Sequence, residues 1–403
     1  MGTLAFDRRN SPELPSAEAQ SVPPIATRCL ALLLALAAVY SSAQAVEHLT
    51  LRREGREEQA SGRVLVEAAD GVLLEAADGV LWLATKDETI SRSADDAPFK
   101  ALEAAATGQR LLTELPPGFD VHTTRHYVIA FNTSRAYAQW VGALFERLYG
   151  AFTNYWSRRG FELHDPEFPL VVVVFGSREA YLAHARAELG EGADTIIGYY
   201  SLRTNRVTMF DLTGIEAYGG GLGNRRPNAA AINRLLSQPG AEKGVATIIH
   251  EATHQIAYNC GLHTRFADIP LWVSEGLAVY FETPDLSSVK GWRTIGAVNT
   301  ERLARFRQYT ANRGAGSLES LVSDDARFRN ARTALDAYAE AWALNYFLIR
   351  QRPKEYAKYV KSLAAKQRLD WDKPAERLSE FQTAFGELKA LDREFLRYFE
   401  KLR

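Results

Sequence analysis

His250-Glu251-Ala252-Thr253-His254 and, further along, Trp272-Val273-Ser274-Glu275-Gly276 are the stretches that decide the fold of this chain. On a helix the two histidines lie four residues apart, a rotation of roughly 400°, so both imidazoles leave the same face one turn apart. At that separation two nitrogens can reach one zinc ion at about 2.0–2.1 Å. Glu251 projects about 100° round the helix from His250, where a general base belongs. Catalytic zinc usually takes three protein ligands, and Glu275 is the candidate for the third.

The surrounding residues favour a helix for each stretch. Pro239-Gly240 ends the preceding segment, and Gly261 stops the first helix. From Ala241 onward the apolar residues recur at helical spacing, namely Val245, Ile248, Ile249, Ala252 and Ile256. A second helix is expected to start near Pro270 and to carry Glu275 in its first turns. The alternative is that two ordinary histidines lie on an amphipathic helix without binding a metal.

HEATHQ followed by LWVSEGLAVYFE resembles the gluzincin metallopeptidases, whose third zinc ligand is a glutamate on a second helix. The W-x-x-E-G-L-A-x-Y-F-E form most resembles the DUF1570, or peptidase MA-like, family of secreted gluzincin-like proteins. The resemblance covers roughly residues 120–350, with sharp motifs only between 250 and 282. It implies one Zn²⁺ per chain held by His250, His254 and Glu275, with Glu251 as the general base.

The chain departs from this pattern at one position. Many gluzincins carry an acid four residues after the glutamate ligand, which orients a ligand histidine, whereas this chain has Val279 there. Glu282 is the candidate replacement, and a solvated surface carboxylate is the competing interpretation. Related peptidases also stabilise the oxyanion with a Tyr or His from beyond the ligand helix. The candidates for that role, each of which can equally be structural, are Tyr338, Tyr280 and His263.

The order of elements predicts an α+β protein. We expect a signal segment over residues 1–45, a small β unit over 46–115, a gluzincin-like domain with a mixed sheet over 116–290, and a helical part over 291–403. In the β unit, Asp70-Gly71 and Asp78-Gly79 lie in two copies of one short repeat and predict tight turns. Strands are predicted at 122–131, 170–175 and 205–212, and helices at 135–156, 179–189, 300–312, 333–351, 353–366 and 375–402.

Three further segments bear on the site. Residues 206–211 are placed to form a sheet-edge strand that pairs with a substrate backbone, or else an ordinary internal strand. The glycine-rich stretch 215–230 lacks the Lys-Ser/Thr of a phosphate-binding loop and is expected to be a flap or a surface loop. His122 and His126 are also four apart, but their surroundings predict a strand, where that spacing is about 13 Å and too wide for one ion.

Composition and the first residues bear on partners and location. A formal net charge of -1 over 403 residues gives no electrostatic reason to expect nucleic acid as a partner. The apolar run at 29–39, followed by Ala43-Gln44-Ala45, predicts a cleaved secretory signal and an extracytoplasmic protein with no stable membrane span. An uncleaved anchor is the alternative. Cleavage would leave Cys260 as a lone cysteine, expected to be a small buried apolar residue.

Two functions follow from these observations. The first is a zinc-dependent peptidase acting on peptide or protein substrates, and the absence of a G-x-M-E-N-like stretch before the zinc helix favours an endopeptidase. Zinc polarises the scissile carbonyl in such enzymes, and a glutamate takes the proton of the attacking water. The second is an extracytoplasmic peptide-binding or scaffold module with a non-catalytic zinc site. Glu251 distinguishes them, because a binding module has no need of it.

Overall fold

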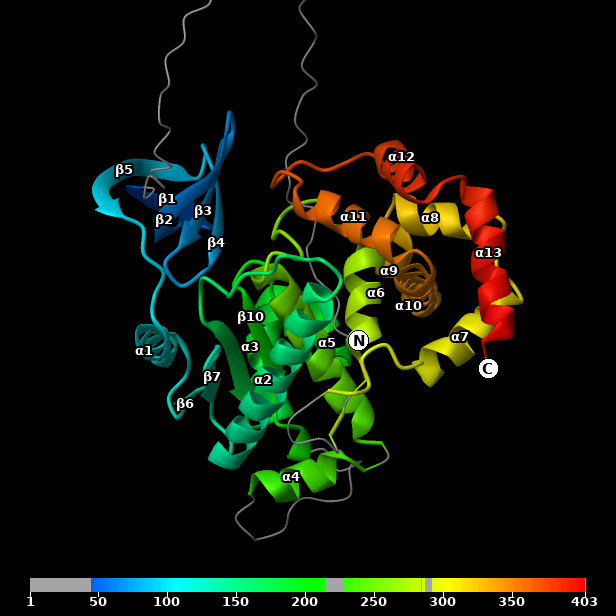
Figure 1. Ribbon diagram of the computed structural model, residues 1–403. Coiled ribbons are helices and arrows are strands. Elements are labelled where there is room, and N and C mark those ends of the chain that lie inside the picture. Colours follow the sequence, from blue (N-terminus) through cyan, green and yellow to red (C-terminus); the bar gives the residue numbers. More distant parts are fainter. Residues whose placement is uncertain (1–44, 215–227, 239, 284, 287–291, 403) are drawn as a thin grey trace, which may run out of the picture.

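The computed structural model describes residues 45–214, 228–238, 240–283, 285–286 and 292–402 (Figure 1). It confirms the α+β class: an N-terminal antiparallel sheet is followed by a mixed sheet with helices and then by a helical part. The predicted signal segment lies outside the described residues apart from Ala45, and so does most of the glycine-rich stretch 215–230. None of the helices in the described part of the chain combines the length and the apolarity that a membrane span requires.

The N-terminal sheet has the order β4-β3-β2-β1-β5. Its strands are β1 (Ala45–Arg53), β2 (Arg56–Ala68), β3 (Gly71–Ala76), β4 (Leu81–Thr85) and β5 (Thr89–Pro98). Both predicted turns are confirmed, because Asp70-Gly71 joins β2 to β3 and Asp78-Gly79 joins β3 to β4. Gly79 adopts φ +80°, which a residue with a side chain rarely does.

This sheet rests on the segment that joins the two predicted ligand helices. Leu73 and Leu81 pack with Phe266, and the Arg265 guanidinium donates to a Glu75 carboxylate oxygen at 2.6 Å. Both charged residues are buried, so the pair lies out of water. The same guanidinium donates to the Gly79 carbonyl at 2.8 Å. The contact therefore joins the N-terminal sheet to the residues directly beyond the first ligand helix.

The second sheet is mixed, with the order β6-β7-β8-β10-β9. Its strands are β6 (Asp120–Thr123), β7 (Tyr127–Phe131), β8 (Leu170–Phe175), β9 (Gly198–Tyr200) and β10 (Arg206–Phe210). The parallel pairs are β7–β8 and β8–β10, and β6 and β9 run antiparallel to their neighbours. As its continuous apolar sequence predicts, β8 is buried on both faces: Val172 and Val174 face one core, Val171 and Val173 the other.

Two predictions on this sheet are wrong. Residues 122–131 form a hairpin rather than one strand, because Glu146 accepts hydrogen bonds from the Thr124 hydroxyl and the His126 amide and stabilises a turn there. Residues 206–211 are not at the edge, since β10 lies between β8 and β9. The edge strand on this side of the sheet is β9, which has only three residues and was not predicted. The alternative of an internal strand for 206–211 is the correct one.

Helices cover both faces of the mixed sheet (Figure 1). On one face lie α1 (Ala104–Glu114) and α3 (Arg178–Leu189), and on the other α2 (Arg135–Ser157), α4 (Ala229–Leu236) and α5 (Glu242–Asn259). Two short 3₁₀ turns follow α3 and β10, at Gly190–Thr195 and Leu212–Gly214. Cys260, just after α5, is buried and free, as expected.

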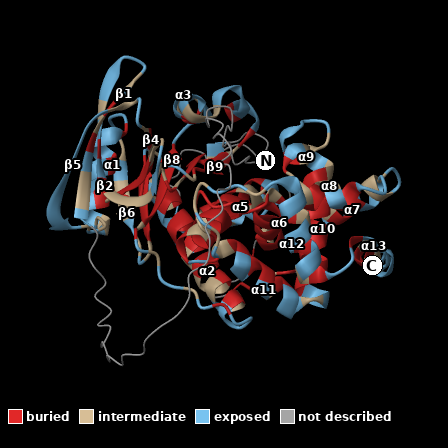
Figure 2. Ribbon diagram, turned by 90° about the horizontal axis from the view of Figure 1, so that it is seen from above, coloured by how far each residue is buried: buried red, intermediate tan, exposed pale blue. Residues whose placement is uncertain are grey.

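The helical part packs around α10, which is buried along nearly its whole length (Figure 2). Its helices are α6 (Leu271–Phe281), α7 (Thr300–Thr310), α8 (Ser317–Ser323), α9 (Ala326–Arg329), α10 (Ala334–Gln351), α11 (Pro353–Ala364), α12 (Pro374–Phe385) and α13 (Leu388–Lys401). The single helix predicted over 375–402 is two, because Gly386 adopts φ +92° and ends α12. The short helices α8 and α9 were not predicted.

Helix α6 approaches α10 closely at Gly276, which has no side chain to keep the two helices apart. A Cβ at this position would lie 2.5 Å from the Ala341 carbonyl oxygen and 2.1 Å from Asn345 Nδ2. Asn345 Nδ2 itself donates to the Trp272 and Ala341 carbonyls at 2.7 and 2.8 Å. The two helices therefore meet almost backbone to backbone, and only glycine fits between them.

Gly276→Ala is expected to destabilise the protein, because its methyl group would press on backbone atoms of α10 that cannot turn aside. Overpacking of this kind costs about 1–3 kcal/mol and sometimes more. Thermal or urea unfolding of the full chain measures the loss. Gly150→Ala in α2 is the matched control, since no atom lies within 4 Å of its Cβ position. Equal stability of the two variants would contradict the tight contact.

Candidate metal centre

Helix α5 presents His250, Glu251 and His254 from within the core. Its predicted apolar stripe is fully buried, and Gly261 follows with φ +85°, which turns the chain back. The stripe packs α5 under the mixed sheet, so the polar side chains leave the helix on the side toward β9 and α6. All three of these polar residues are buried.

Helix α6 brings Glu275 to the same place. In the segment between the two helices, Asp268 is fully buried. Its carboxylate accepts a hydrogen bond from Arg377 Nε of α12 at 2.8 Å. This ion pair fixes the connecting segment to the helical part. The contact with α10 at Gly276 fixes the next residue along α6, so Glu275 faces α5.

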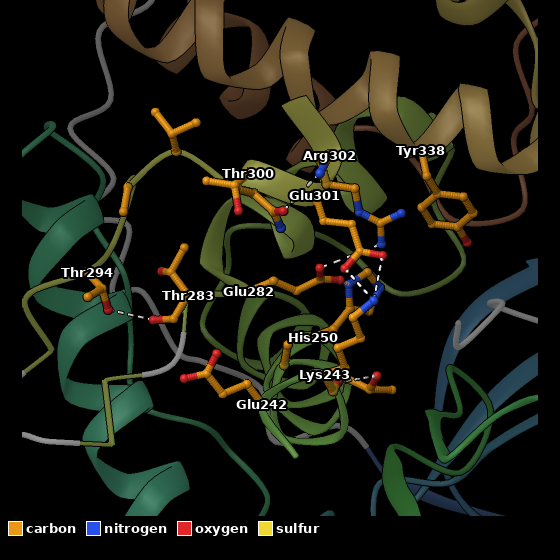
Figure 3. Close-up of a pocket in the computed structure, with 15 residues that line it drawn as sticks. Glu242, Lys243, His250, Glu282, Thr283, Thr294, Thr300, Glu301, Arg302 and Tyr338 are labelled. Atoms are coloured by element: carbon orange, nitrogen blue, oxygen red, sulfur yellow. Dashed lines mark hydrogen bonds and ion pairs between the residues drawn. The ribbon is translucent and has the colours of Figure 1, made fainter. Parts of the chain in front are cut away.

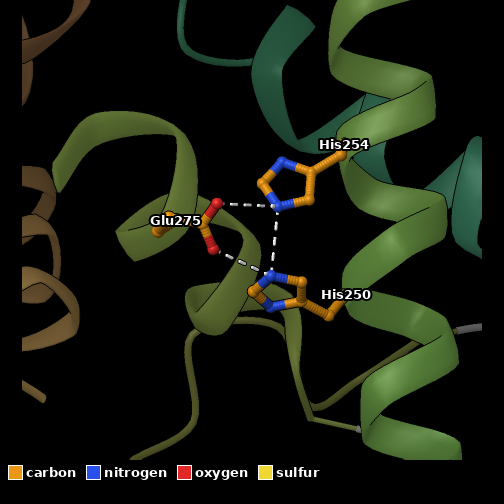
Figure 4. A group of neighbouring side chains, drawn as sticks. All are labelled: His250, His254 and Glu275. Carbon is orange, nitrogen blue, oxygen red and sulfur yellow. Dashed lines mark hydrogen bonds and ion pairs between the residues drawn. The ribbon is translucent and has the colours of Figure 1, made fainter. Parts of the chain in front are cut away.

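The three side chains converge (Figure 4). His250 Nε2 lies 3.1 Å from Glu275 Oε2 and 3.0 Å from His254 Nε2, and His254 Nε2 lies 3.6 Å from Glu275 Oε1. Among the described residues this is the one group of histidine, cysteine and acidic side chains whose ligand atoms come close enough to hold a metal ion.

The group fits a tetrahedral metal ion by spacing and by chemistry. Ligand atoms about 2.05 Å from a tetrahedral zinc ion are about 3.3 Å from one another, and the three separations bracket that value. Two imidazole nitrogens and one carboxylate are the ligands of many catalytic zinc sites. Glu275 Oε1 is buried and has no hydrogen-bond partner in the described chain. The group could therefore hold a metal ion and leave a fourth position open.

The electrostatics of the group favour positive charge. Burial alone would lower the pKa of His250, but hydrogen bonds with Glu275 and Glu282 raise it to about 10. Burial alone would raise the pKa of Glu275, but the charge of His254 and a hydrogen bond from His250 bring it down to about 2. The carboxylates that stabilise a proton on His250 would also stabilise a divalent cation, so the pocket is suited to bind one.

Glu282 lies behind His250 (Figure 3). Its Oε1 is 2.7 Å from His250 Nδ1, and its Oε2 is 3.6 Å from the Arg302 guanidinium at the start of α7. A carboxylate on the far nitrogen fixes the imidazole orientation and raises its basicity. Glu282 thus occupies the place that the resemblance assigns to an acid at position 279, where Val279 is buried in the apolar core.

Glu251 sits between the edge strand and the three converging groups. Its Oε2 accepts from the Tyr200 amide of β9 at 2.8 Å, while Oε1 is buried with no partner among the described residues. Burial raises the pKa of Glu251, and the charges of His250 and His254 oppose that rise. One carboxylate oxygen is therefore held and the other is available.

The three aromatic candidates lie in different places. Tyr338 of α10 lines the cleft, and burial, together with the charges of Glu275 and Glu251, raises its pKa well above the usual value. Tyr280 is not brought to the group, because its hydroxyl lies 2.8 Å from the Tyr155 hydroxyl in an aromatic cluster. His263 is buried beyond the end of α5.

A cleft of about 570 Å³ opens beside His250 (Figure 3). The first half of α5 forms one wall with Ala246 and Thr247, and the segment leading into α7 forms the other. An ion pair of Lys243 with Glu301, 3.0 Å long, joins the two walls at the rim. The cleft gives a ligand access to the buried group.

Two contributors to the site were missed in the sequence. The Tyr200 amide belongs to a strand of three residues, too short for any periodicity to indicate. Arg302 lies on a predicted helix, but nothing local shows that this helix turns toward Glu282. His122 and His126 do not form a second site, because the His126 ring is 2.7 Å from Glu146 Oε2 and stacks on Tyr149.

Comparison with known families identifies a DUF1570 domain, described as a protein of unknown function, at residues 244–370. The matched region contains His250, Glu251, His254, Glu275 and Gly276, together with Glu282 and Tyr338. Comparison with curated proteins gave no match.

His250→Ala and Glu275→Ala are each expected to abolish stable metal binding, because two protein ligands rarely hold zinc tightly. Metal content of the full chain after dialysis against a weak chelator measures this, with about one ion expected in the wild type. His126→Ala is the control, since that histidine is paired elsewhere. Unchanged metal affinity in Glu275→Ala would place the third ligand at another residue.

Glu282→Ala is expected to weaken zinc binding about 10- to 100-fold, because His250 would lose the carboxylate that orients it. Competition with a chromophoric chelator gives the dissociation constant. Glu301→Ala is a matched control, because it removes a carboxylate from the same cleft without touching a ligand. If both variants bind zinc equally well, Glu282 is only a cleft-wall residue.

Proposed function

We propose that this protein is a zinc-dependent peptidase that hydrolyses peptide bonds, most readily within a chain. One observation carries the proposal: Glu251, buried and within electrostatic reach of His250, His254 and Glu275, keeps one carboxylate oxygen without a partner among the described residues. A cleft opens beside His250, the neighbour of Glu251 on α5. A metal-binding module that does no chemistry needs the three ligand residues and has no use for a fourth, half-satisfied carboxylate.

A zinc ion held by these three residues would supply Lewis-acid polarisation of the scissile carbonyl and a lowered pKa for the attacking water. Glu251 Oε1 would accept the proton of that water and later deliver it to the leaving amine. The Tyr200 amide holds the other oxygen, so the carboxylate needs no rotation to act. Its raised pKa suits a group that must both accept and release a proton.

Tyr338 is the candidate to stabilise the developing oxyanion. Burial, together with the nearby carboxylates of Glu275 and Glu251, raises the pKa of Tyr338 well above its usual value, so the hydroxyl stays protonated and remains a hydrogen-bond donor. Its ring lies against Arg302, whose guanidinium carbon is 5.7 Å from the ring centre. Tyr338 therefore has a fixed orientation at the cleft wall.

The edge strand β9 offers a way to bind a peptide backbone. It pairs with β10 on one side, and its Tyr200 amide contacts Glu251 on the other. A peptide added along this edge would pass directly over α5. The cleft beside His250 would then receive the residues on one side of the scissile bond, an arrangement that suits cleavage within a chain.

One observation favours a second function, a peptide-binding module with a structural metal. The hydrogen bond between Glu251 and the Tyr200 amide also ties α5 to the sheet edge, which is a structural task. In that case replacing Glu251 would lower the stability of the fold and would leave turnover unchanged. One experiment therefore distinguishes the two candidate functions.

Glu251→Gln is expected to bind one zinc ion normally and to lose peptide hydrolysis by about 100- to 10,000-fold, because the amide cannot take a proton from water. Turnover of a mixed peptide library by the full zinc-loaded chain measures this. Glu242→Gln, on the first turn of the same helix, is the control. If Glu251→Gln hydrolyses peptides as fast as the wild-type protein, Glu251 is not the general base. If the wild-type protein binds zinc but cleaves no peptide, the binding module is favoured.

A further inference from the structure

A second and smaller cavity, of about 50 Å³, is formed near the end of α5. Its walls come from the turn after β9, the last turns of α5, the segment between α5 and α6, and the loop between α11 and α12. These segments are far apart in the chain, and the fold brings them together at one place. The cavity is called the small cavity below.

Two of the lining residues place the small cavity next to the metal ligands. Tyr258 follows His254 by four residues on α5, and Leu271 precedes Glu275 by four residues on α6. Residues at this spacing are neighbours on a helix surface, with Cβ atoms about 5–6 Å apart. The larger cleft, by contrast, is lined by residues that precede His250 on α5. The cleft and the small cavity therefore lie on either side of the ligand group along α5.

The small cavity also lies where a peptide bound at the sheet edge would pass. Leu202, two residues beyond the end of β9, lines it. The ring of Tyr258 stacks on the ring of Tyr200, with centroids 5.9 Å apart. The Tyr200 amide is the group that holds Glu251. The strand that holds the proposed general base is thus in contact with a wall of the small cavity.

One wall of the small cavity has a backbone conformation that bulky residues rarely adopt. Phe266, which lines the cavity, has φ +63°, and Leu369 has φ +64°. The Leu369 amide donates to the Phe266 carbonyl at 2.7 Å, and Phe266 packs on Leu73 and Leu81 of the N-terminal sheet. Unfavourable backbone angles persist where the surrounding structure imposes them, and they are concentrated at functional sites. The surrounding contacts therefore fix the shape of this wall.

The lining favours a small apolar occupant. The apolar lining residues are Leu202, Phe266, Ala267, Ile269, Leu271 and Trp371. The charged lining residues are paired with one another, since Arg377 donates to Asp325 at 3.0 Å and Arg329 lies 3.7 Å from the same carboxylate. A cavity of about 150 Å³ accommodates benzene, whereas about 10–15 Å³ is enough for a water molecule. At about 50 Å³ the small cavity suits an aliphatic side chain and is too small for an aromatic ring.

We propose that the small cavity is a specificity pocket, which receives a small aliphatic side chain of the peptide substrate on the side of the scissile bond opposite to the cleft. This assignment rests on the proposed peptidase function. One helix turn of about 5.4 Å corresponds to one or two residues of extended peptide at about 3.3 Å each. The side chain therefore belongs to one of the two residues next to the scissile bond on that side.

Trp371→Ala and Leu202→Ala enlarge the small cavity from two different walls. We expect the zinc-loaded wild type to cleave peptides with valine at the selected position about 10-fold faster than peptides with phenylalanine there, and each variant to lose most of that difference. Rates and cleavage sites are measured by mass spectrometry on a peptide library, with zinc content measured alongside. Leu112→Ala in α1 is the matched control, because it removes a similarly exposed apolar side chain on the face of the mixed sheet away from α5.

The assignment would be overturned by a wild type that cleaves the valine and phenylalanine peptides equally fast. An unchanged preference in both variants would also overturn it, as would an equal loss of rate for every peptide, because the two residues would then only support the fold. If the wild type binds zinc and cleaves no peptide at all, the proposed function and the pocket assignment fail together, and this outcome is distinct from the other three.

Discussion

The near contact of two backbones at Gly276 is the constraint on which the candidate site depends. Glu275 is the neighbour of that glycine, so the distance between α6 and α10 determines where the Glu275 carboxylate lies. A shift of α6 outward by one methyl group would move Glu275 away from two histidines whose nitrogens are 3.0 Å apart. The precision of the group therefore comes from packing on the far side of α6.

Support for the site is divided among distant parts of the chain. Glu282 and Arg302 stabilise the first histidine from the end of α6 and the start of α7, and the edge strand β9 holds Glu251. Asp268 and Arg377 fix the connection between the ligand helices to α12. Each of these contacts involves a buried or partly buried charge, and such charges are costly unless they are paired. Each of these charges has a hydrogen-bond or ion-pair partner, which offsets the cost of burying it.

The sequence predicted what depends on local pattern. The spacing of Val245, Ile248 and Ile256 was sufficient for α5, and the run of valines was sufficient for a buried strand at β8. Residues 206–210 were identified as a strand, but their place in the sheet depends on β9, whose three residues carry no periodic signal. The break at Gly386 could be seen only as a single glycine in an otherwise helical pattern. Glu282 was a candidate by position, and its contact with His250 depends on how α6 and α7 pack, which no local pattern contains.

The Arg265–Glu75 pair has a consequence for how the molecule unfolds. Arg265 lies in the connection between the ligand helices, while Glu75 belongs to the N-terminal sheet, so removing the sheet would leave a buried guanidinium without its counter-charge. Breaking a buried pair in this way generally costs several kcal/mol. The N-terminal sheet and the candidate metal site should therefore open as one cooperative unit in hydrogen exchange, although in the chain they are separated by the whole of the mixed sheet.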